Sequence, residues 1–390
     1  MKRLASQVIP FALAAALALP AFSLARTKLV TLPDRATMVV NLEHPSQSLL
    51  HEERDITLQQ GTNFVDFSWQ GVSIDRDSIR LELLSNPGDG PQASKIIHVA
   101  FPPNEPALTW QIYSPEARTE RIRVSYLLHG ITRESSYEMT VNAAEDQAIF
   151  QQYFQMTNAS GEDLNNSAFR IRQTDDLERS VENGETRRFL AFQQRELPIR
   201  KLFVTRPDPY STRGEDGEII SLVYEIENAK TMGLGTFKLD PGKTRIYGEA
   251  PDGSTIFLGE DYLKETPTGE EAQLTLGTVK DVVLKRRIMN DKQENQRRNN
   301  NKRVVLYDRV VHLRYEIENF KDKAATVRVI ETIPPDAKII ESDDKGVKIE
   351  RKSGSELQID IDLEPRPAGS DEDVPVREIN IVYKIENVMG

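Results

Sequence analysis

The sequence predicts an all-β protein built from tandem β-sandwich domains of the immunoglobulin-like type, and three observations predict it. Apolar and polar residues alternate in runs along the whole chain, a period that places one set of side chains on one face of a strand. Turn-forming pairs rich in asparagine, aspartate and glycine separate these runs. No stretch carries a convincing apolar stripe at helical spacing over three turns.

The composition sets the broad class of the protein and excludes several others. The chain has 390 residues, no cysteine and a formal net charge of −11. Without cysteine it forms neither a disulfide scaffold nor a zinc–cysteine cluster. Its acidic balance excludes a basic nucleic-acid binder, so no nucleic-acid partner is expected. Hydrophobic residues make up 38%, which over this length is enough for several cores.

Residues 1–25 have the organisation of a cleaved secretory signal peptide. Two basic residues precede an apolar segment over residues 8–22, and Ser23 and Ala25 are small residues at the expected cleavage site. An uncleaved membrane anchor is the alternative, but the apolar run is shorter than the roughly 20 residues that a span needs. We therefore expect an exported bacterial protein, periplasmic or extracellular, with no transmembrane span in the mature chain.

Individual strands can be placed from the alternation. Over residues 64–69, Val65, Phe67 and Trp69 fall on one face. The same alternation appears over residues 79–83, 122–127 and 357–363. Residues 146–156 are also interpreted as a strand, although their propensity allows a helix. The turns expected between such runs are Asn183-Gly184, Asp216-Gly217, Asp252-Gly253, Lys345-Gly346 and residues 86–90.

A short motif, aromatic-x-aliphatic-x-Asn, occurs four times and supports a repeated sandwich unit. It ends at Asn158, Asn228, Asn319 and Asn387, which lie 70, 91 and 68 residues apart. Because the aromatic and aliphatic residues are two apart, both are expected in a core, with the charged residues between them facing water. The asparagine is expected to close the strand through an Asx turn or left-handed backbone. Glutamates of the motif acting as ligands are the alternative interpretation.

The repeat spacing divides the mature chain into four β units. Residues 26–115 form an N-terminal β domain, and residues 116–215 and 216–288 form two further β domains. Residues 289–390 form a C-terminal immunoglobulin-like sandwich. Strands can pair across these boundaries, which are soft by several residues.

Several segments of residues 122–390 resemble a known family. Residues 124–137 carry Val-Ser-Tyr-Leu-Leu-His-Gly-Ile, and residues 158–163 carry Asn-x-x-Gly-Glu-Asp. Both are similar to segments of the mucoidy-inhibitor-like proteins, whose shared region is domain of unknown function 4139. The later segments that resemble the family, in the same order, are residues 257–260, 266–270, 276–277, 315–319 and 331–334.

The resemblance implies an exported β-rich protein and supplies no catalytic residues. Two departures from the family pattern stand out. Family members often carry a coiled coil ahead of this region, and no heptads occur here. Arg133 stands where the family tends to have tryptophan.

Motifs for catalysis or metal binding are weak. The five histidines, at no metal-ligand spacing, are His44, His51, His98, His129 and His312. Neither a nucleophile elbow nor a phosphate loop occurs. We therefore predict no catalytic, cofactor-binding or metal-binding residue and no cofactor. Acidic stretches at residues 215–216, 343–344 and 371–373 are interpreted as solvated loops, with calcium binding as the alternative.

One segment reverses the acidic character of the chain. Between residues 285 and 303 only Asp291 and Glu294 oppose eight cations. The segment is interpreted as a long, solvated and mobile hairpin loop between residues 282–284 and 304–307. The functional hypothesis is a docking loop for a polyanion such as lipopolysaccharide or an acidic protein. Its cations are Lys285, Arg286, Arg287, Lys292, Arg297, Arg298, Lys302 and Arg303.

Two functions from different classes follow. The favoured one is an exported, non-enzymatic protein that binds a protein or an envelope polymer, or supports the bacterial envelope. The alternative is a carboxylate-dependent, glycosidase-like hydrolase acting outside the cytoplasm. The hydrolase needs a concave pocket with converging carboxylates. An exposed sheet edge or flat apolar patch would favour the binding module.

Overall fold

The protein is almost entirely β-sheet over the residues that the computed structural model describes. These residues are 29–44, 47–84, 94–172, 175–208, 217–250, 252–342, 346–366 and 374–390. They form strands β1 to β25 and two short 3₁₀ turns, η1 (Arg76–Ser78) and η2 (Lys230–Met232), so the prediction of an all-β chain is confirmed. In these ranges no helix has the length and apolar character that crossing a bilayer requires.

Some predicted features fall outside the described residues. They are the signal peptide, the turn over residues 86–90 and the three acidic stretches at residues 215–216, 343–344 and 371–373. The turns at Asn183-Gly184 and Asp252-Gly253 are present, and their glycines have φ of 83° and 80°. Positive φ is a conformation that glycine adopts without steric cost.

The chain folds into two compact units, and the first is discontinuous. It consists of Met1–Ile131 and Asn158–Glu185, and the second unit consists of Thr132–Thr157 and Thr186–Gly390. The division into four β units, expected from the repeat, remains a prediction. The expected boundary near residue 115 falls inside the first unit, where strands on either side of it pair with each other.

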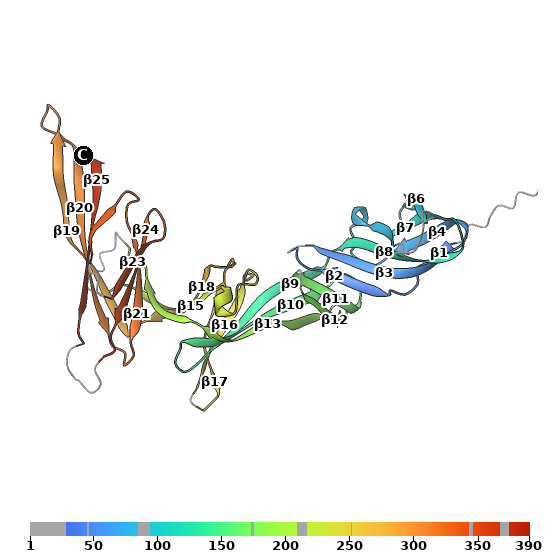
Figure 1. Cartoon of the computed structure of the whole chain (residues 1–390), viewed down its shortest axis with the longest axis horizontal. Coiled ribbons are helices and arrows are strands. Elements are labelled where there is room, and N and C mark those ends of the chain that lie inside the picture. Colours follow the sequence, from blue (N-terminus) through green and yellow to red (C-terminus); the bar gives the residue numbers. More distant parts are fainter. Residues whose placement is uncertain are drawn as a thin grey trace, which may run out of the picture. The chain divides into compact units, whose positions relative to one another are not determined.

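The first unit packs two sheets face to face (Figure 1). Phe67 of one sheet contacts Tyr126 of the other with ring centroids 5.7 Å apart. The first sheet has the order β1 (Leu29–Thr31), β4 (Gly61–Ser68), β7 (Ala107–Ser114), β6 (Lys95–Ala100). The second has the order β12 (Asp175–Val181), β11 (Leu164–Arg172), β2 (Thr37–Asn41), β3 (Ser48–Leu58), β8 (Arg118–Leu128), β5 (Arg80–Leu84).

The second unit is built around one six-stranded sheet, one face of which packs against two other sheets. Tyr224 and Ile226 contribute to a core with one of them, and Val327 and Val329 to a core with the other. The central sheet has the order β18 (Glu271–Val279), β15 (Ile220–Glu227), β14 (Arg200–Thr205), β21 (Ala325–Thr332), β24 (Glu356–Leu363), β23 (Val347–Arg351).

Two flanking sheets complete this unit. The five-stranded one has the order β13 (Thr186–Pro198), β10 (Gln147–Asn158), β9 (Ile131–Val141), β16 (Gly242–Glu249), β17 (Thr255–Leu263). The four-stranded one has the order β19 (Val282–Arg298), β20 (Val304–Asn319), β25 (Arg377–Met389), β22 (Lys338–Ser342). Residues 146–156, interpreted as a strand, are strand β10.

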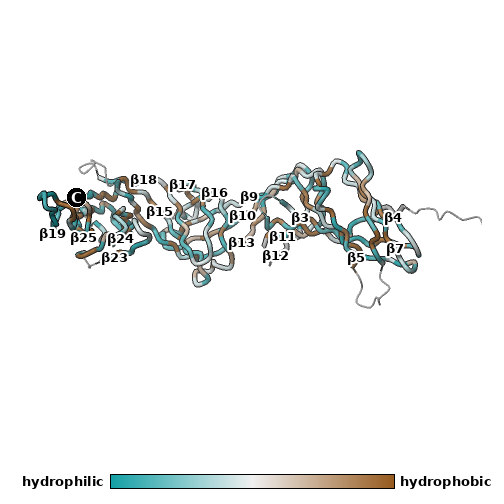
Figure 2. Tube along the Cα trace, turned by 90° about the horizontal axis from the view of Figure 1, so that it is seen from above, coloured by the Kyte–Doolittle hydropathy of each residue, from teal (hydrophilic) through white to brown (hydrophobic). Residues whose placement is uncertain are grey.

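The predicted alternation matches the observed burial. Val65, Phe67 and Trp69 are buried on the inner face of the first unit. In β24 the four aliphatic residues at alternate positions are buried as well. Figure 2 shows this alternation of hydrophilic and hydrophobic residues along the trace. Burial of one face of each strand is therefore the main local determinant of this fold.

The aromatic-x-aliphatic-x-Asn motif behaves as a core strand in all four copies. Its aromatic and aliphatic side chains are buried, and Tyr315 and Ile317 are 0% exposed, as predicted. The expectation that the charged residues face water is wrong for Glu225, which is 2% exposed. Its burial is possible because the Arg328 guanidinium lies against its carboxylate.

The asparagine that ends the motif is a buried anchor in three copies. Asn158, Asn228 and Asn319 are buried, whereas Asn387 is exposed and has φ of 55°. Backbone amides two residues on donate to Oδ1 of Asn158 and Asn319, forming the predicted Asx turns. Asn228 instead accepts from the amide of Gly235.

Candidate functional site

The basic segment is a strand, not the predicted loop. Strand β19 continues to Arg298 and pairs with β20, from Val282 opposite Asn319 to Arg298 opposite Val304. Only the turn at residues 299–303 connects the two strands, and Oδ1 of Asn299 accepts from the amides of Asn301 and Arg303. Backbone pairing with β20, which pairs with β25 on its other side, offsets the lack of apolar residues.

Two of the eight predicted cations form ion pairs within the protein. Arg286 points inward and forms an ion pair with Glu331, with Nη2 2.7 Å from Oε1, and its side chain is only 10% exposed. The Tyr315 hydroxyl donates to the same carboxylate at 2.8 Å. Arg287 pairs with Glu316 at 3.3 Å. Arg286 therefore belongs to the core and does not belong to a docking surface.

Five of the remaining cations are exposed toward the end of the hairpin. Of the two acidic residues of the segment, Asp291 pairs with Arg309 on β20. Lys285 is partly buried nearer the base of the hairpin. The five cations, called the hairpin cations below, are Lys292, Arg297, Arg298, Lys302 and Arg303.

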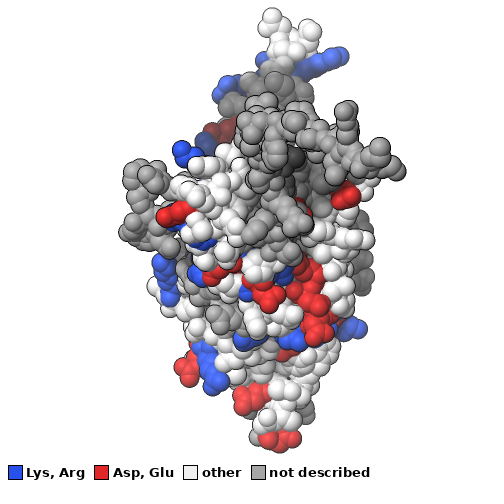
Figure 3. Space-filling model, turned by 90° about the vertical axis from the view of Figure 1, so that its right-hand side faces the viewer, with Lys and Arg blue, Asp and Glu red and all other residues white. Residues whose placement is uncertain are grey.

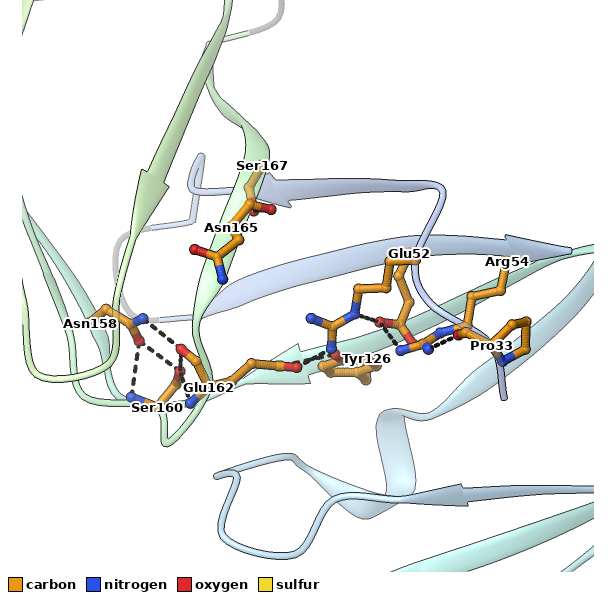
Figure 4. A network of polar contacts seen from close by, with 10 residues as sticks. Pro33, Glu52, Arg54, Tyr126, Asn158, Ser160, Glu162, Asn165 and Ser167 are labelled. Carbon is orange, nitrogen blue, oxygen red and sulfur yellow. Dashed lines mark hydrogen bonds and ion pairs between the residues drawn. The ribbon is translucent and has the colours of Figure 1, made fainter. Parts of the chain in front are cut away.

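A second polar site lies in the first unit, where two arginines contact a buried carboxylate. Glu52 on β3 is 0% exposed and forms ion pairs with Arg35 and Arg54. Arg35 also pairs with Glu162, and the Tyr126 hydroxyl lies 3.3 Å from Glu162 Oε2. Figure 4 shows Glu52, Tyr126 and Glu162 converging in this network. We call it the Arg35 cluster.

The turn that follows β10 holds Glu162 in place. Nδ2 of Asn158 donates to the carbonyl of Glu162 at 2.7 Å, and its Oδ1 accepts from the hydroxyl of Ser160 at 2.7 Å. Gly161 has φ of 88°, and a Cβ there would come 1.9 Å from the carbonyl of Gly71. A glycine is therefore required at this position.

Burial and charge shift the pKa values of this cluster. Burial raises the pKa of the Tyr126 hydroxyl, and the nearby carboxylates of Glu52 and Glu162 raise it further. Burial alone would lower the pKa of Arg35, but the same carboxylates raise it above its usual value. Both groups therefore stay protonated, so the cluster holds fixed donors at neutral pH.

Two cavities adjoin the Arg35 cluster. One, of about 310 Å³, is lined by Arg35, Arg54, Asp66, Tyr126 and Glu162 together with apolar residues. Its apolar lining consists of Leu32, Phe67, Trp69, Val72 and Ile74. The other, of about 390 Å³, shares Arg35 and Arg54 and is otherwise lined by Asp34, Ala36, Thr37, Met38, Asp163, Asn165 and Asn166.

No protein-family model matches the chain. A search of curated proteins also returns no match. The function has to be argued from the two sites themselves.

The predicted absence of a metal site remains a prediction. In the part of the chain that the structure describes, no three histidine or acidic side chains gather in a way that could hold a metal ion. His51 lies 2.7 Å from the hydroxyl of Ser125, and His312 lies 3.1 Å from Asn380 Oδ1. These two histidines thus have partners within the β-sheets.

Proposed function

We propose that the protein is an exported, non-enzymatic binding module of the bacterial envelope that engages an anionic polymer through its β19–β20 hairpin. The observation that carries the proposal is the set of five hairpin cations, exposed on one hairpin of a chain with net charge −11. Among the described residues they form no ion pair with an acidic side chain. Such a local excess of positive charge attracts a polyanion despite the acidic whole.

The strand geometry supports this use of the hairpin. Pairing with β20 fixes the backbone at Lys292, Arg297 and Arg298, so binding costs less backbone entropy than it would for a mobile loop. Figure 3 shows basic and acidic side chains interspersed on one face of the molecule. Mixed charge of this kind does not favour a polymer of one sign.

A hydrolase is the second candidate, because Asp66 and Glu162 line one cavity. Both oxygens of Glu162 already have partners, Oε1 with Arg35 and Oε2 with the Tyr126 hydroxyl. Asp66 Oδ1 accepts from Thr109 at 2.6 Å. A general acid has to hold a proton close to the leaving group, and three of the four carboxyl oxygens of this pair are already engaged within the protein. The binding module is therefore preferred.

The resemblance to the mucoidy-inhibitor-like proteins is compatible with this proposal. Tyr126 and Glu162, which meet in the Arg35 cluster, come from two of the segments that carry the resemblance. Membership of that family, immunoglobulin-like topology and export all form part of the proposal.

The experiment measures binding of the full mature chain to dextran sulfate at increasing salt, with uncharged dextran as the reference polymer. We expect saturable binding to dextran sulfate that weakens steeply with salt, because the screening length is only about 8 Å at 0.15 M. Reversing three hairpin cations, in R297E/R298E/R303E, should weaken binding at least ten-fold at low salt.

A matched control separates the hairpin from net charge. The triple variant K230E/K264E/K280E changes the net charge by the same amount at exposed lysines outside the hairpin. It should bind within about two-fold of the wild type. Equal losses in the two triple variants, or binding that is insensitive to salt, would remove the docking role of the hairpin.

A further inference from the structure

We propose that the first unit contains a saccharide-binding site in the cavity of about 310 Å³ beside the Arg35 cluster. This site is separate from the hairpin, which belongs to the second unit. Saccharide binding and polyanion binding can therefore be tested independently of each other.

The lining of the cavity is divided between apolar and polar groups. Trp69, Val72 and Ile74 supply apolar surface, and Arg35, Asp66 and Glu162 supply charged donors and acceptors. A pyranose ring combines an apolar C–H surface with a rim of hydroxyl groups. A volume of this size is in the range that small-molecule sites occupy.

The balance of charge favours a neutral ligand. The guanidinium of Arg35 is shared between Glu52 and Glu162, and that of Arg54 binds Glu52 and the carbonyl of Pro33. An anion would meet the carboxylates of Asp66 and Glu162, and a cation would meet both guanidinium groups. A hydroxyl both donates and accepts, so it can use the two kinds of group together.

The adjoining cavity extends the site beyond one ring. It shares Arg35 and Arg54 with the first cavity and adds the polar side chains of Thr37, Asn165 and Asn166. Amide and hydroxyl side chains of this kind hydrogen-bond sugar hydroxyls in either direction. The site therefore fits an oligosaccharide better than a single sugar.

Isothermal titration calorimetry of the full chain tests the proposal directly. The probes are chitotriose, cellotriose and maltotriose, with inorganic phosphate and choline as charged probes. We expect saturable binding of at least one trisaccharide and none of phosphate or choline. The chain has two tryptophans, so Trp69 is the sole tryptophan in a Trp110→Phe variant. The fluorescence of Trp69 in this variant should change as the trisaccharide is added. The dissociation constant from that change should equal the calorimetric one.

Two variants and one control locate the site. Asp66→Asn removes a charge in the cavity, and Val72→Phe fills part of it. Each substitution should weaken binding of the trisaccharide at least ten-fold. Asp55→Asn removes an equal charge from a surface pair with Arg121 and should change affinity less than two-fold. Dextran sulfate binding should be unchanged in all three, which keeps this site distinct from the hairpin.

Several outcomes would overturn the proposal. They are the absence of saturable binding by all three trisaccharides, preferential binding of phosphate or choline, and equal effects of Asp55→Asn and Asp66→Asn. Release of new reducing ends from a trisaccharide would assign the cavity to a hydrolase instead. Circular dichroism of each variant shows whether it is folded, and if Asp66→Asn is unfolded, Val72→Phe decides.

Discussion

Buried carboxylates among the described residues are matched with guanidinium groups. Glu52 pairs with Arg35, Glu225 with Arg328, and Glu331 with Arg286. A carboxylate buried alone costs several kcal/mol, whereas a hydrogen-bonded pair largely offsets that cost. In the Glu52 and Glu331 pairs, the guanidinium therefore allows an acidic residue to occupy a strand position that the alternation directs inward. Glu225 lies on the opposite face of β15 from Tyr224 and Ile226, and Arg328 allows it to be buried there.

Removing one partner of such a pair should be strongly destabilising. Arg328 is 0% exposed and also binds Asp360 through two hydrogen bonds, at 2.7 and 2.8 Å. Arg328→Met removes the cation that Asp360 and the buried Glu225 share, and Glu225 then keeps the exposed Arg200 as its cation. We expect a loss of about 3–5 kcal/mol in unfolding free energy. Arg200→Met removes a cation that is 53% exposed and should cost less than about 1 kcal/mol. Urea unfolding followed by circular dichroism measures both.

The repeated motif makes a second prediction about single residues. Ile317 is 0% exposed in the core between the central sheet and the four-stranded sheet. Ile317→Ala should lower the unfolding free energy by about 2–4 kcal/mol, because it leaves a cavity in a packed core. Ile219 is 59% exposed, and Ile219→Ala should change stability by less than about 0.5 kcal/mol. Similar costs at the two positions would contradict the core role of the motif.

His51 makes the stability of the first unit depend on pH. Burial lowers its pKa from 6.5, and the Arg123 guanidinium lowers it further. The unfolded chain therefore takes up a proton below about pH 6.5 that the folded chain resists, so stability is present above this pH and lost as the pH falls. Both tryptophans lie in this unit, and urea unfolding followed by their fluorescence at pH 7.5 and 5.5 measures the loss. The loss of stability between pH 7.5 and 5.5 should be smaller in His51→Gln.

At the scale of elements, the same corner is built twice around an asparagine. The amide of Asn158 donates to the carbonyl of Glu185, and its carbonyl accepts from Gly184. Asn228 makes the same two bonds with Glu270 and Gly269. A strand end and a Gly-Glu turn are thus fastened together in both units through backbone bonds. The asparagine side chain adds a further bond at each corner, from Nδ2 to the carbonyl of Val181 in one and of Thr266 in the other.

Replacing the corner asparagine should cost much more than replacing its exposed counterpart. Nδ2 of Asn228 donates to the carbonyls of Phe237, Thr266 and Pro267 at 3.0–3.1 Å. Asn228→Ala leaves these three carbonyls, of which that of Thr266 is buried, without that donor, and we expect a loss of about 2–3 kcal/mol. Asn387→Gly keeps the positive φ and removes no buried anchor, so its melting temperature should stay within about 2 °C of the wild type. Thermal denaturation measures both variants, and the melting temperature of Asn228→Ala should be the lower of the two.

Strands with a buried face could be predicted from the sequence, but the basic hairpin could not. Residues 290–303 carry no apolar residue, so their composition indicates a loop. Their strand conformation comes from pairing with β20, which is itself held by β25. Residues far apart in sequence provide that support, and a single sequence does not reveal them.

The Arg35 cluster was beyond prediction for a similar reason. Its members come from four segments, around Arg35, Glu52, Tyr126 and Glu162, that only the sheet order brings together. The one available signal was the Asn-x-x-Gly-Glu-Asp turn, whose glycine has the positive φ that such a turn requires. That turn indicated the local backbone geometry, without indicating which arginine Glu162 would contact.

At the scale of the whole molecule, the sheets explain why the first unit is discontinuous in sequence. In the first unit β8 pairs with both β3 and β5. Strand β11 pairs in parallel with β2, with Ala168 opposite Val39. The segment Asn158–Glu185 therefore completes a sheet that begins near the start of the described chain. Strands β2 and β11 are thus neighbours in this sheet although they are far apart in the sequence.

This topology predicts which fragment can fold alone. A fragment of residues 26–115 lacks β8, β11 and β12, which are half of the second sheet, and should be unfolded. Residues 132–157 belong to the second unit, and their flanks are adjacent because the amide of Ala159 donates to the carbonyl of Gly130 at 2.7 Å. Replacing residues 132–157 by an Asn-Gly turn in a fragment of residues 26–185 should therefore preserve the unit.

Tryptophan fluorescence during urea unfolding distinguishes the two fragments. The joined fragment should unfold cooperatively, with a midpoint close to the transition that the same tryptophans report in the full chain. The fragment of residues 26–115 contains both tryptophans as well but should show solvent-exposed emission without a transition. A cooperative transition in this shorter fragment would favour the boundary near residue 115, because it would show that β8 and the segment Asn158–Glu185 are dispensable for folding.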